Sequence, residues 1–257
     1  MSQLPKTVHL EIASTESELA AHAVNLITQA AQKAYGERAI FRLVLAGGST
    51  PLETYKLLAK NKASHKIDWA QTQVFWSDER MVEPQDADSN YLMASTTLLQ
   101  HLDIPEANIF RMRGELTPEM ADKEYIDQLA RAFNNQPAVF DLVLLGMGAD
   151  GHTASLFPGT EFGELSDSPV ISQYIERLDS WRISLSMTTL LASRETIFLV
   201  QGKDKAERLA NVLEYSVEQA DTVPSAYLVA NSINKVTFIV DREAATQLSD
   251  STLADLQ

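Results

Sequence analysis

Short, mainly apolar segments of strand length alternate with segments of helical periodicity along the whole chain, and this alternation restricts the possible fold. The clearest apolar segments are Phe41–Ala46, Val74–Ser77 and Phe140–Leu145. A strand that is apolar on both faces is typical of a parallel sheet that helices cover on both sides. We therefore predict an α/β fold in which helices flank a mostly parallel, doubly wound sheet.

The same patterns predict the remaining elements. Further strands are expected at Val8–Ala13, Arg182–Ser186, Thr196–Val200 and Val236–Val240. Helices are expected from Thr15 toward Tyr35, from Thr50, from Ser89 to about Leu102, from Thr117 to about Phe133, and from about Asp204 to Tyr215. Gly36 is placed to end the first of these helices, and Thr50 to cap the second one before Pro51.

The length of the chain, 257 residues, is near the upper limit for a single hydrophobic core. We assign residues 1–257 to one domain, and a small second lobe is also compatible with this length. Residues 158–179 are the least regular part of the pattern, which makes them a candidate lobe junction or lid.

The composition excludes several classes of function. A formal net charge of −14 repels polyphosphate backbones and anionic lipid, so we expect neither nucleic acid nor a membrane as partner. The absence of cysteine excludes disulfide scaffolds, thiolate zinc sites, iron–sulfur clusters and cysteine nucleophiles. Residues 1–13 carry no signal-peptide pattern, and no window approaches 18 uninterrupted apolar residues, which predicts a cytoplasmic protein. The sequence assigns no oligomeric state.

The turn after the apolar segment Phe41–Ala46 is rich in glycine and reads GGSTP at residues 47–51. Two glycines permit a sharp turn, and the N-terminus of the following helix offers free N–H groups at the positive end of its dipole. Ser49 and Thr50 add hydroxyl donors. Such a turn is typical of a cradle for a phosphate monoester, although a well-capped turn without a ligand explains the segment equally well.

A second glycine-rich segment, GMGADGH at residues 146–152, follows the apolar segment Phe140–Leu145. Its three glycines match the spacing of the dinucleotide-binding fingerprint. We reject that interpretation because Asp150 would place a carboxylate where a pyrophosphate should lie. Pro158 also comes too soon for the long helix of that motif.

His152 is the histidine that is best placed for chemistry. It follows Asp150 by two residues at the end of a predicted strand, where a carboxylate can orient the imidazole. The remaining histidines lie in patterned or polar segments and are interpreted as structural or solvated; they are His9, His22, His65 and His101. His152 is therefore the candidate general base, with Asp150 as its partner.

Two charged segments also follow predicted strands. The first, residues 78–80 (DER), is most simply a solvated turn, but Arg80 is also suited to bind a phosphate or to stabilise an oxyanion. The second, residues 202–205 (GKDK), opens a helix, and Lys205 more than Lys203 is placed to reach a phosphate. The chain has no G-x-S-x-G, H-E-x-x-H or G-x-x-x-x-G-K-[ST] motif, which counts against a serine hydrolase, a zinc hydrolase and a P-loop nucleotidase.

Together, residues 45–51 (LAGGSTP), 76–80 (WSDER) and 146–158 (GMGADGHTASLFP) resemble the 6-phosphogluconolactonases. The resemblance extends to residues 89–91 and 223–226 and so spans most of the chain. It implies hydrolysis of 6-phosphoglucono-δ-lactone to 6-phosphogluconate, the second step of the oxidative pentose phosphate pathway. It also implies a small sugar phosphate as the binding partner, with no cofactor and no metal ion.

The resemblance further implies roles for individual residues. His152 is expected to take a proton from the attacking water, Asp150 to orient the imidazole, and Arg80 to stabilise the oxyanion or bind phosphate. The predicted substrate-binding residues are Gly47, Gly48, Ser49, Thr50, Asp78, Gly148, Gly151, Arg182 and Lys205. The chain departs from the lactonase pattern in having no proline just before Arg182 and in having Leu191 where asparagine is expected.

Two alternative functions remain open. The glucosamine-6-phosphate isomerases/deaminases share the fold, a similar glycine turn and an Asp-Gly-His motif. They typically place a glutamate where this chain has Phe157 and an aromatic residue where it has Arg80, and both differences favour the lactonase. The other alternative is a sugar-phosphate sensor without turnover, against which the intact Asp150, His152 and Arg80 count.

Overall fold

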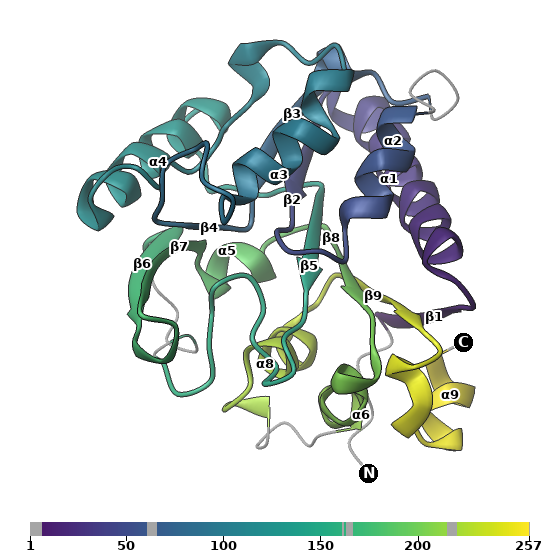
Figure 1. Ribbon diagram of the computed structural model, residues 1–257. Helices are drawn as coiled ribbons and strands as arrows, with labels where there is room; N and C mark the ends of the chain where they lie inside the picture. Colours follow the sequence, from purple (N-terminus) through teal and green to yellow (C-terminus); the bar gives the residue numbers. More distant parts are fainter. Residues whose placement is uncertain (1–6, 61–65, 161, 163–166, 215–219, 257) are drawn as a thin grey trace.

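The computed structural model describes residues 7–60, 66–160, 162, 167–214 and 220–256. Six parallel strands form its central sheet in the order β1-β9-β8-β5-β2-β3 (Figure 1). These strands are β1 (Val8–Ala13), β2 (Phe41–Leu45), β3 (Thr72–Trp76), β5 (Leu142–Gly146), β8 (Glu195–Val200) and β9 (Lys235–Asp241). Leu43–Leu45 in β2 and Leu142–Leu145 in β5 are completely buried, which explains why these strands are apolar on both faces.

Helices cover both faces of this sheet: α1 and α2 lie on one side and α6 and α8 on the other (Figure 1). The α-helices are α1 (Glu16–Arg38), α2 (Leu52–Lys60), α3 (Asn90–Thr97), α4 (Pro118–Ala132), α5 (Met187–Leu191), α6 (Ala206–Glu214), α8 (Pro224–Asn231) and α9 (Asp250–Leu256). The 3₁₀ helices are η1 (Trp69–Gln71), η2 (Leu99–His101), η3 (Glu106–Asn108), η4 (Glu176–Leu178), η5 (Lys203–Lys205) and η6 (Ala244–Gln247). The predicted α/β fold, a mostly parallel sheet flanked by helices, is confirmed.

A second, three-stranded antiparallel sheet lies beside the central one, in the order β4-β7-β6. Its strands are β4 (Asp78–Arg80), β6 (Val170–Ile175) and β7 (Ser180–Leu185). Ser77 connects the two sheets, because its N–H donates to the Leu45 carbonyl (2.9 Å) and its carbonyl accepts from the Leu185 N–H (2.9 Å). The chain therefore passes directly from β3 of the central sheet into β4 of the small sheet.

The small sheet corrects two predictions. Residues 78–80 are a strand and not a solvated turn, because Asp78–Arg80 pairs with Arg182–Ser184 of β7. The described part of residues 158–179 is also more regular than predicted, since it contains β6 and η4. β6 lies on a sheet edge and is buried only at its two ends, Val170 and Ile175, so its sequence lacks the continuous apolar signal of the central strands.

Three helix boundaries also differ from the predictions, and one of them is the end of α3 at Thr97 instead of near Leu102. α1 continues through Gly36 to Arg38 and ends at Ala39, which has a left-handed φ of 58° and donates its N–H to the Tyr35 carbonyl. α2 begins at Leu52, and its first helical hydrogen bond runs to the carbonyl of Pro51, one residue beyond the predicted cap. The predicted end of the last helix, Tyr215, lies outside the described residues. Among the described helices, none is both long and apolar enough to cross a membrane.

The direction of winding in the central sheet changes between β2 and β5. From β2 the chain proceeds outward to β3, whereas from β5 it proceeds to β8 and β9 in the opposite direction. In open α/β sheets, ligands bind at such a switch point, outside the carboxyl ends of the strands. β2 and β5 lead into residues 47–51 and 146–152, so the fold brings the two glycine-rich segments together.

Candidate active site

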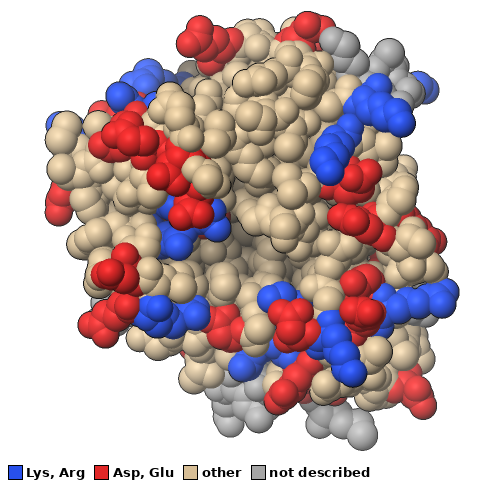
Figure 2. All heavy atoms as spheres, in the orientation of Figure 1, with Lys and Arg blue, Asp and Glu red and all other residues tan. Residues whose placement is uncertain are grey.

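A cavity of about 590 Å³ lies at this switch point, between the carboxyl ends of the central strands and the small sheet. Figure 2 shows this face of the molecule hollowed near its middle, with both basic and acidic side chains around the hollow. The cavity has the size of a typical small-molecule site. It is lined by Ala46, Gly47, Gly48, Ser49, Thr50, Ser77, Asp78, Arg80, Asn90, Gly146, Met147, Gly148, His152, Ala154, Ser155, Phe157, Arg177, Leu178, Arg182, Gln201, Asp204 and Lys205.

The glycine-rich turn after β2 forms one part of the wall. Gly48 has a left-handed φ of 84°, and a Cβ atom on Gly47 would lie 2.1 Å from Oδ1 of Asn90. Both positions therefore favour glycine, one for its backbone conformation and one for space. The buried Tyr55 hydroxyl fixes the start of the turn, because it donates to the Ala46 carbonyl (2.8 Å) and accepts from the Ala46 N–H (2.9 Å).

His152 and Asp150 form a close pair in the segment after β5. Oδ1 of Asp150 lies 2.6 Å from Nδ1 of His152 and also accepts from the His152 backbone N–H at 3.1 Å. Nδ1 is thus engaged, which leaves Nε2 as the ring nitrogen for a reacting water. Partial burial acts to raise the pKa of Asp150, but the hydrogen bonds from His152 and the charges of His152 and Arg177 outweigh it and lower this pKa.

The backbone around His152 is held by its neighbours. Gly148 donates its N–H to the His152 carbonyl (2.9 Å), and Thr153 Oγ1 donates to the Gly146 carbonyl (2.9 Å). A Cβ atom on Gly148 would lie 2.0 Å from Nδ1 of His152, so the imidazole occupies the space that this glycine leaves free. Gly151 has a left-handed φ of 85° and faces a methyl group of Val223, where a Cβ atom would approach within 2.3 Å.

No helix follows β5 within residues 147–160, which consist of turns and one isolated bridge. The dinucleotide-binding fingerprint requires a helix there to present its N-terminus to the pyrophosphate. The rejection of that motif is therefore confirmed by the local structure.

Two arginines lie opposite each other on neighbouring strands of the small sheet. Arg80 of β4 pairs with Arg182 of β7, and both line the cavity. Arg80 is held by the Asp88 carbonyl, whereas the buried Nε of Arg182 has no hydrogen-bond partner among the described residues. Burial and the charge of Arg80 lower the pKa of Arg182. Like charges directly opposite each other destabilise a sheet. An anion bound between the two guanidinium groups would offset this repulsion, so this wall of the cavity is suited to bind an anion.

The two acidic residues of β4 have different surroundings. Glu79 is almost fully buried and accepts from the backbone N–H groups of Arg80, Asn90 and Tyr91 at 2.7–2.8 Å, and from the Ser89 hydroxyl. Burial raises the pKa of Glu79, although the backbone donors oppose this shift. These contacts tie β4 to the N-terminus of α3, which indicates a structural role.

Asp78 instead lines the cavity. Its carboxylate accepts from the hydroxyls of Ser77 (3.0 Å) and Ser155 (2.7 Å). Both hydroxyls also line the cavity, so the carboxylate and these two groups form one polar edge.

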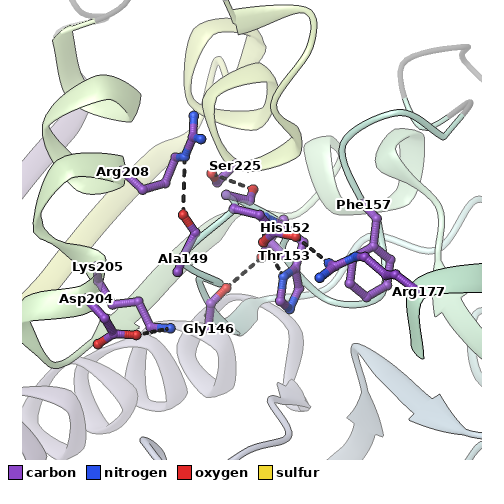
Figure 3. A network of polar contacts seen from close by, with 12 residues as sticks. Gly146, Ala149, His152, Thr153, Phe157, Arg177, Asp204, Lys205, Arg208 and Ser225 are labelled. Carbon is purple, nitrogen blue, oxygen red and sulfur yellow. Dashed lines mark hydrogen bonds and ion pairs between the residues drawn. The ribbon is translucent and has the colours of Figure 1, made fainter.

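Lys205 enters the cavity from the segment after β8. Its Nζ lies 2.9 Å from Oδ2 of Asp204. This ion pair is drawn as a dashed line in Figure 3. The structure therefore brings almost all predicted site residues to one cavity. Of the predicted set, only Asp150 and Gly151 do not line it, and Asp150 lies next to it through its contact with His152. The roles of these residues stay predictions.

Phe157 and Arg177 are two of the cavity-wall residues that were not among the predicted site residues. Phe157 is buried, and its ring centroid lies 4.5 Å from that of His152. Arg177 in η4 pairs with Asp150, and its guanidinium carbon lies 4.8 Å from the Phe157 ring centroid. Figure 3 shows the Arg177 and Phe157 side chains next to each other. Phe157 belongs to a segment that carries the family resemblance, whereas no sequence signal marked Arg177, because it follows a strand that was not predicted.

Two of the remaining histidines, His22 and His101, have contacts outside the cavity. His22 Nδ1 lies 2.8 Å from Glu11, and His101 Nε2 lies 3.1 Å from the Thr96 carbonyl. His65 lies outside the described residues. Within the described part of the chain, no three histidine or acidic side chains gather into a group suited to hold a metal ion.

Comparison with known proteins places the chain in a family. Residues 14–238 match the family of glucosamine-6-phosphate isomerases/6-phosphogluconolactonase. The 6-phosphogluconolactonase of Nostoc sp. is 34% identical over 250 residues, which cover 96% of this chain and 100% of that protein. The 6-phosphogluconolactonase of Haemophilus influenzae is 36% identical over 206 residues, which cover 79% of this chain and 85% of that protein.

A solved structure agrees with this result. The 6-phosphogluconolactonase from Trypanosoma brucei superposes with a TM-score of 0.82 at 29% sequence identity, covering 94% of this chain and 98% of that one. The chain belongs to the glucosamine-6-phosphate isomerase/6-phosphogluconolactonase family. It is similar over nearly its whole length to members that carry the lactonase name.

Proposed function

We propose that this protein is a 6-phosphogluconolactonase, an enzyme that hydrolyses 6-phospho-D-glucono-1,5-lactone to 6-phospho-D-gluconate in the oxidative pentose phosphate pathway. One observation carries the proposal: the carboxylate-bound His152 and the glycine turn at residues 47–50 line the same cavity. A general base and an anion cradle are the two parts that hydrolysis of a phosphorylated lactone requires. The lactonase relatives support the same activity.

In the proposed reaction, Nε2 of His152 accepts a proton as the oxygen of water bonds to the lactone carbonyl carbon. The bond between that carbon and the ring oxygen then breaks, and the proton returns to the ring oxygen, which becomes a hydroxyl group. Asp150 keeps Nδ1 engaged and stabilises the imidazolium that forms in between. General-base help is worth roughly 10²–10⁴-fold in rate.

The phosphate of the substrate is assigned to the turn at residues 47–50, with Lys205 as a further cation at the same cavity. This anchor fixes the position of the sugar ring, so that its carbonyl is held near the base. Arg80 and Arg182 supply positive charge from the small sheet for the anionic groups of the substrate and of the transition state. Asp78 is assigned to a sugar hydroxyl, for which its carboxylate is an acceptor.

The position of Phe157 separates this proposal from the isomerase/deaminase branch of the family. Those enzymes typically have a glutamate at this point, and here an aromatic ring packs on the imidazole in its place. The cavity therefore presents no carboxylate at residue 157 to assist sugar ring opening. The cytoplasmic location and the absence of nucleic-acid and membrane partners stay predictions from the sequence.

The test is a hydrolysis assay in which the lactone is produced in situ from glucose 6-phosphate by a dehydrogenase. Loss of lactone is followed at controlled pH against its spontaneous hydrolysis. The proposal expects a rate that rises in proportion to added enzyme. Ammonia release from glucosamine 6-phosphate would instead establish the deaminase, and binding of 6-phosphogluconate without any turnover would establish the sensor; either result overturns the proposal.

A further inference from the structure

Arg177 lies at the tip of the β6–β7 hairpin and contacts Asp150, the carboxylate that is paired with His152. Its guanidinium group is paired with Oδ2 of Asp150 and lies 4.8 Å from the ring centroid of Phe157. The same residue lines the cavity. Arg177 therefore joins a hairpin of the small sheet to the segment that follows β5.

Four side chains contact one another in a closed ring: Asp150, His152, Phe157 and Arg177. Asp150 uses one carboxylate oxygen for His152 Nδ1, at 2.6 Å, and the other for Arg177. Arg177 lies on Phe157, and the Phe157 ring lies 4.5 Å from the His152 ring. Because both carboxylate oxygens are engaged, rotation of the carboxylate would break a contact on either side.

The hairpin that carries Arg177 is itself well fixed. Tyr174 and Trp181 are direct partners across the two strands, with ring centroids 5.7 Å apart, and the Tyr174 hydroxyl contacts Asp179. Asp179 ends the 3₁₀ turn with a left-handed φ of 46°. On the strand leading to the turn, Gln173 Nε2 donates to the Ser155 carbonyl of the cavity wall. The guanidinium is thus presented by an ordered turn, which reduces the entropy that its ion pair costs.

We propose that Arg177 is a positioning residue for the general base: it holds the Asp150 carboxylate against Nδ1 and so keeps the imidazole of His152 directed at the lactone. This inference rests on the proposed function. An exposed ion pair contributes little to stability, and the Arg177 side chain is 53% exposed. Its effect is therefore expected in the rate of hydrolysis and not in the stability of the fold.

A double-mutant cycle separates this role from direct contact with the substrate. Arg177→Met, Asp150→Asn and the double variant are compared with the unchanged enzyme by kcat and KM. Arg177→Met should lower kcat roughly tenfold, as expected for partners that are coupled in one network, and change KM by less than about twofold. In the Asp150→Asn background the same substitution should lower kcat by less than about twofold, because the carboxylate that Arg177 holds is already gone.

Three results would overturn the proposal. An equal loss of kcat in both backgrounds would mean that Arg177 acts independently of Asp150. A raised KM with unchanged kcat would mean that it binds substrate, and no change at all would mean that the contact is idle. The matched control is Arg113→Met, which removes another exposed arginine with a carboxylate partner, Glu115 at 3.0 Å, away from the cavity and should leave kcat unchanged.

A second measurement needs no activity and so separates this proposal from the proposed function. The ¹⁵N spectrum of the histidine rings reports the tautomer, and a His152→Gln spectrum assigns the His152 signals. The unchanged protein should show Nδ1 protonated, and Arg177→Met should shift His152 toward a mixture of tautomers. Identical His152 signals in the two proteins would overturn the positioning role even if lactonase activity were absent from both.

Discussion

Oδ1 of Asp150 lies 2.6 Å from Nδ1 of His152, although only Gly151 separates the two residues in the chain. So close a pairing requires a sharply turned backbone, which the left-handed φ of Gly151 provides. The consequence is chemical: the carboxylate fixes the ring through one nitrogen and leaves the other one for water. The same segment that makes the turn therefore also defines which ring nitrogen reacts.

The space beside this pair gives a first prediction. Gly148→Ala should lower kcat by about 10-fold or more, because the added Cβ would lie 2.0 Å from Nδ1 of His152 and would displace the imidazole from Asp150. The measurement is the steady-state rate of lactone hydrolysis, with circular dichroism as a check of folding. Gly36→Ala is the control, since a Cβ atom there meets nothing within 4 Å in helix α1. Full activity in Gly148→Ala would contradict the assigned geometry.

The opposed arginines give a second prediction, in which stability and binding change in opposite directions. Arg182→Met should raise the Tm of the free protein by roughly 2–4 °C, as about 1 kcal/mol would in a chain of this size. It removes a buried Nε that has no hydrogen-bond partner in the described part of the chain, and it removes the repulsion from Arg80. The same variant should show a smaller increase of Tm on adding 6-phosphogluconate. A lowered Tm together with an unchanged ligand-induced increase would show that Arg182 faces no anion.

The lowered pKa of Asp150 gives a prediction on pH. Because the folded pKa lies below the ordinary value near 3.9, ionised Asp150 stabilises the fold above that pH, and the contribution is lost as the pH falls through the folded pKa. Asp150→Asn should therefore be less stable than the unchanged protein at pH 7, and the difference should shrink at about pH 3. Urea unfolding at both pH values measures it, with the exposed Asp127→Asn as control. If the difference in unfolding free energy between Asp150→Asn and the unchanged protein grew as the pH fell, the pH dependence would have the opposite sign and would contradict the pairing of Asp150 with His152.

The central sheet could be predicted from the sequence because its strands are buried on both faces. Leu43–Leu45 and Leu142–Leu145 form short, continuous apolar segments, and their length and the glycine-rich turns that follow them favour buried strands over helices. The site followed from the same signal, since the segments after such strands meet at one edge of the sheet. Gly47–Thr50 and His152 were found in this way.

Of the small sheet, β7 was predicted as the strand expected at Arg182–Ser186, whereas β4 and β6 were not, for reasons that particular residues make clear. Asp78–Arg80 is only three residues long and fully charged, and its acids accept hydrogen bonds from the start of α3 and from the Ser155 hydroxyl, which is distant in sequence. Four hydrogen-bond donors converge on Glu79 and permit its burial. No local sequence pattern indicates that a glutamate at this position is buried. Arg177 reaches Asp150 across 27 positions of the chain, so only the three-dimensional arrangement could reveal it.

The most direct test of the whole account compares hydrolysis and binding in His152→Ala. We predict that this variant loses roughly 10²–10⁴-fold in the rate of lactone hydrolysis, while calorimetry shows that it still binds 6-phosphogluconate, because the turn at residues 47–50 and the cationic side chains are unchanged. Hydrolysis at nearly the original rate would contradict the account, since some other group would then have to activate the water.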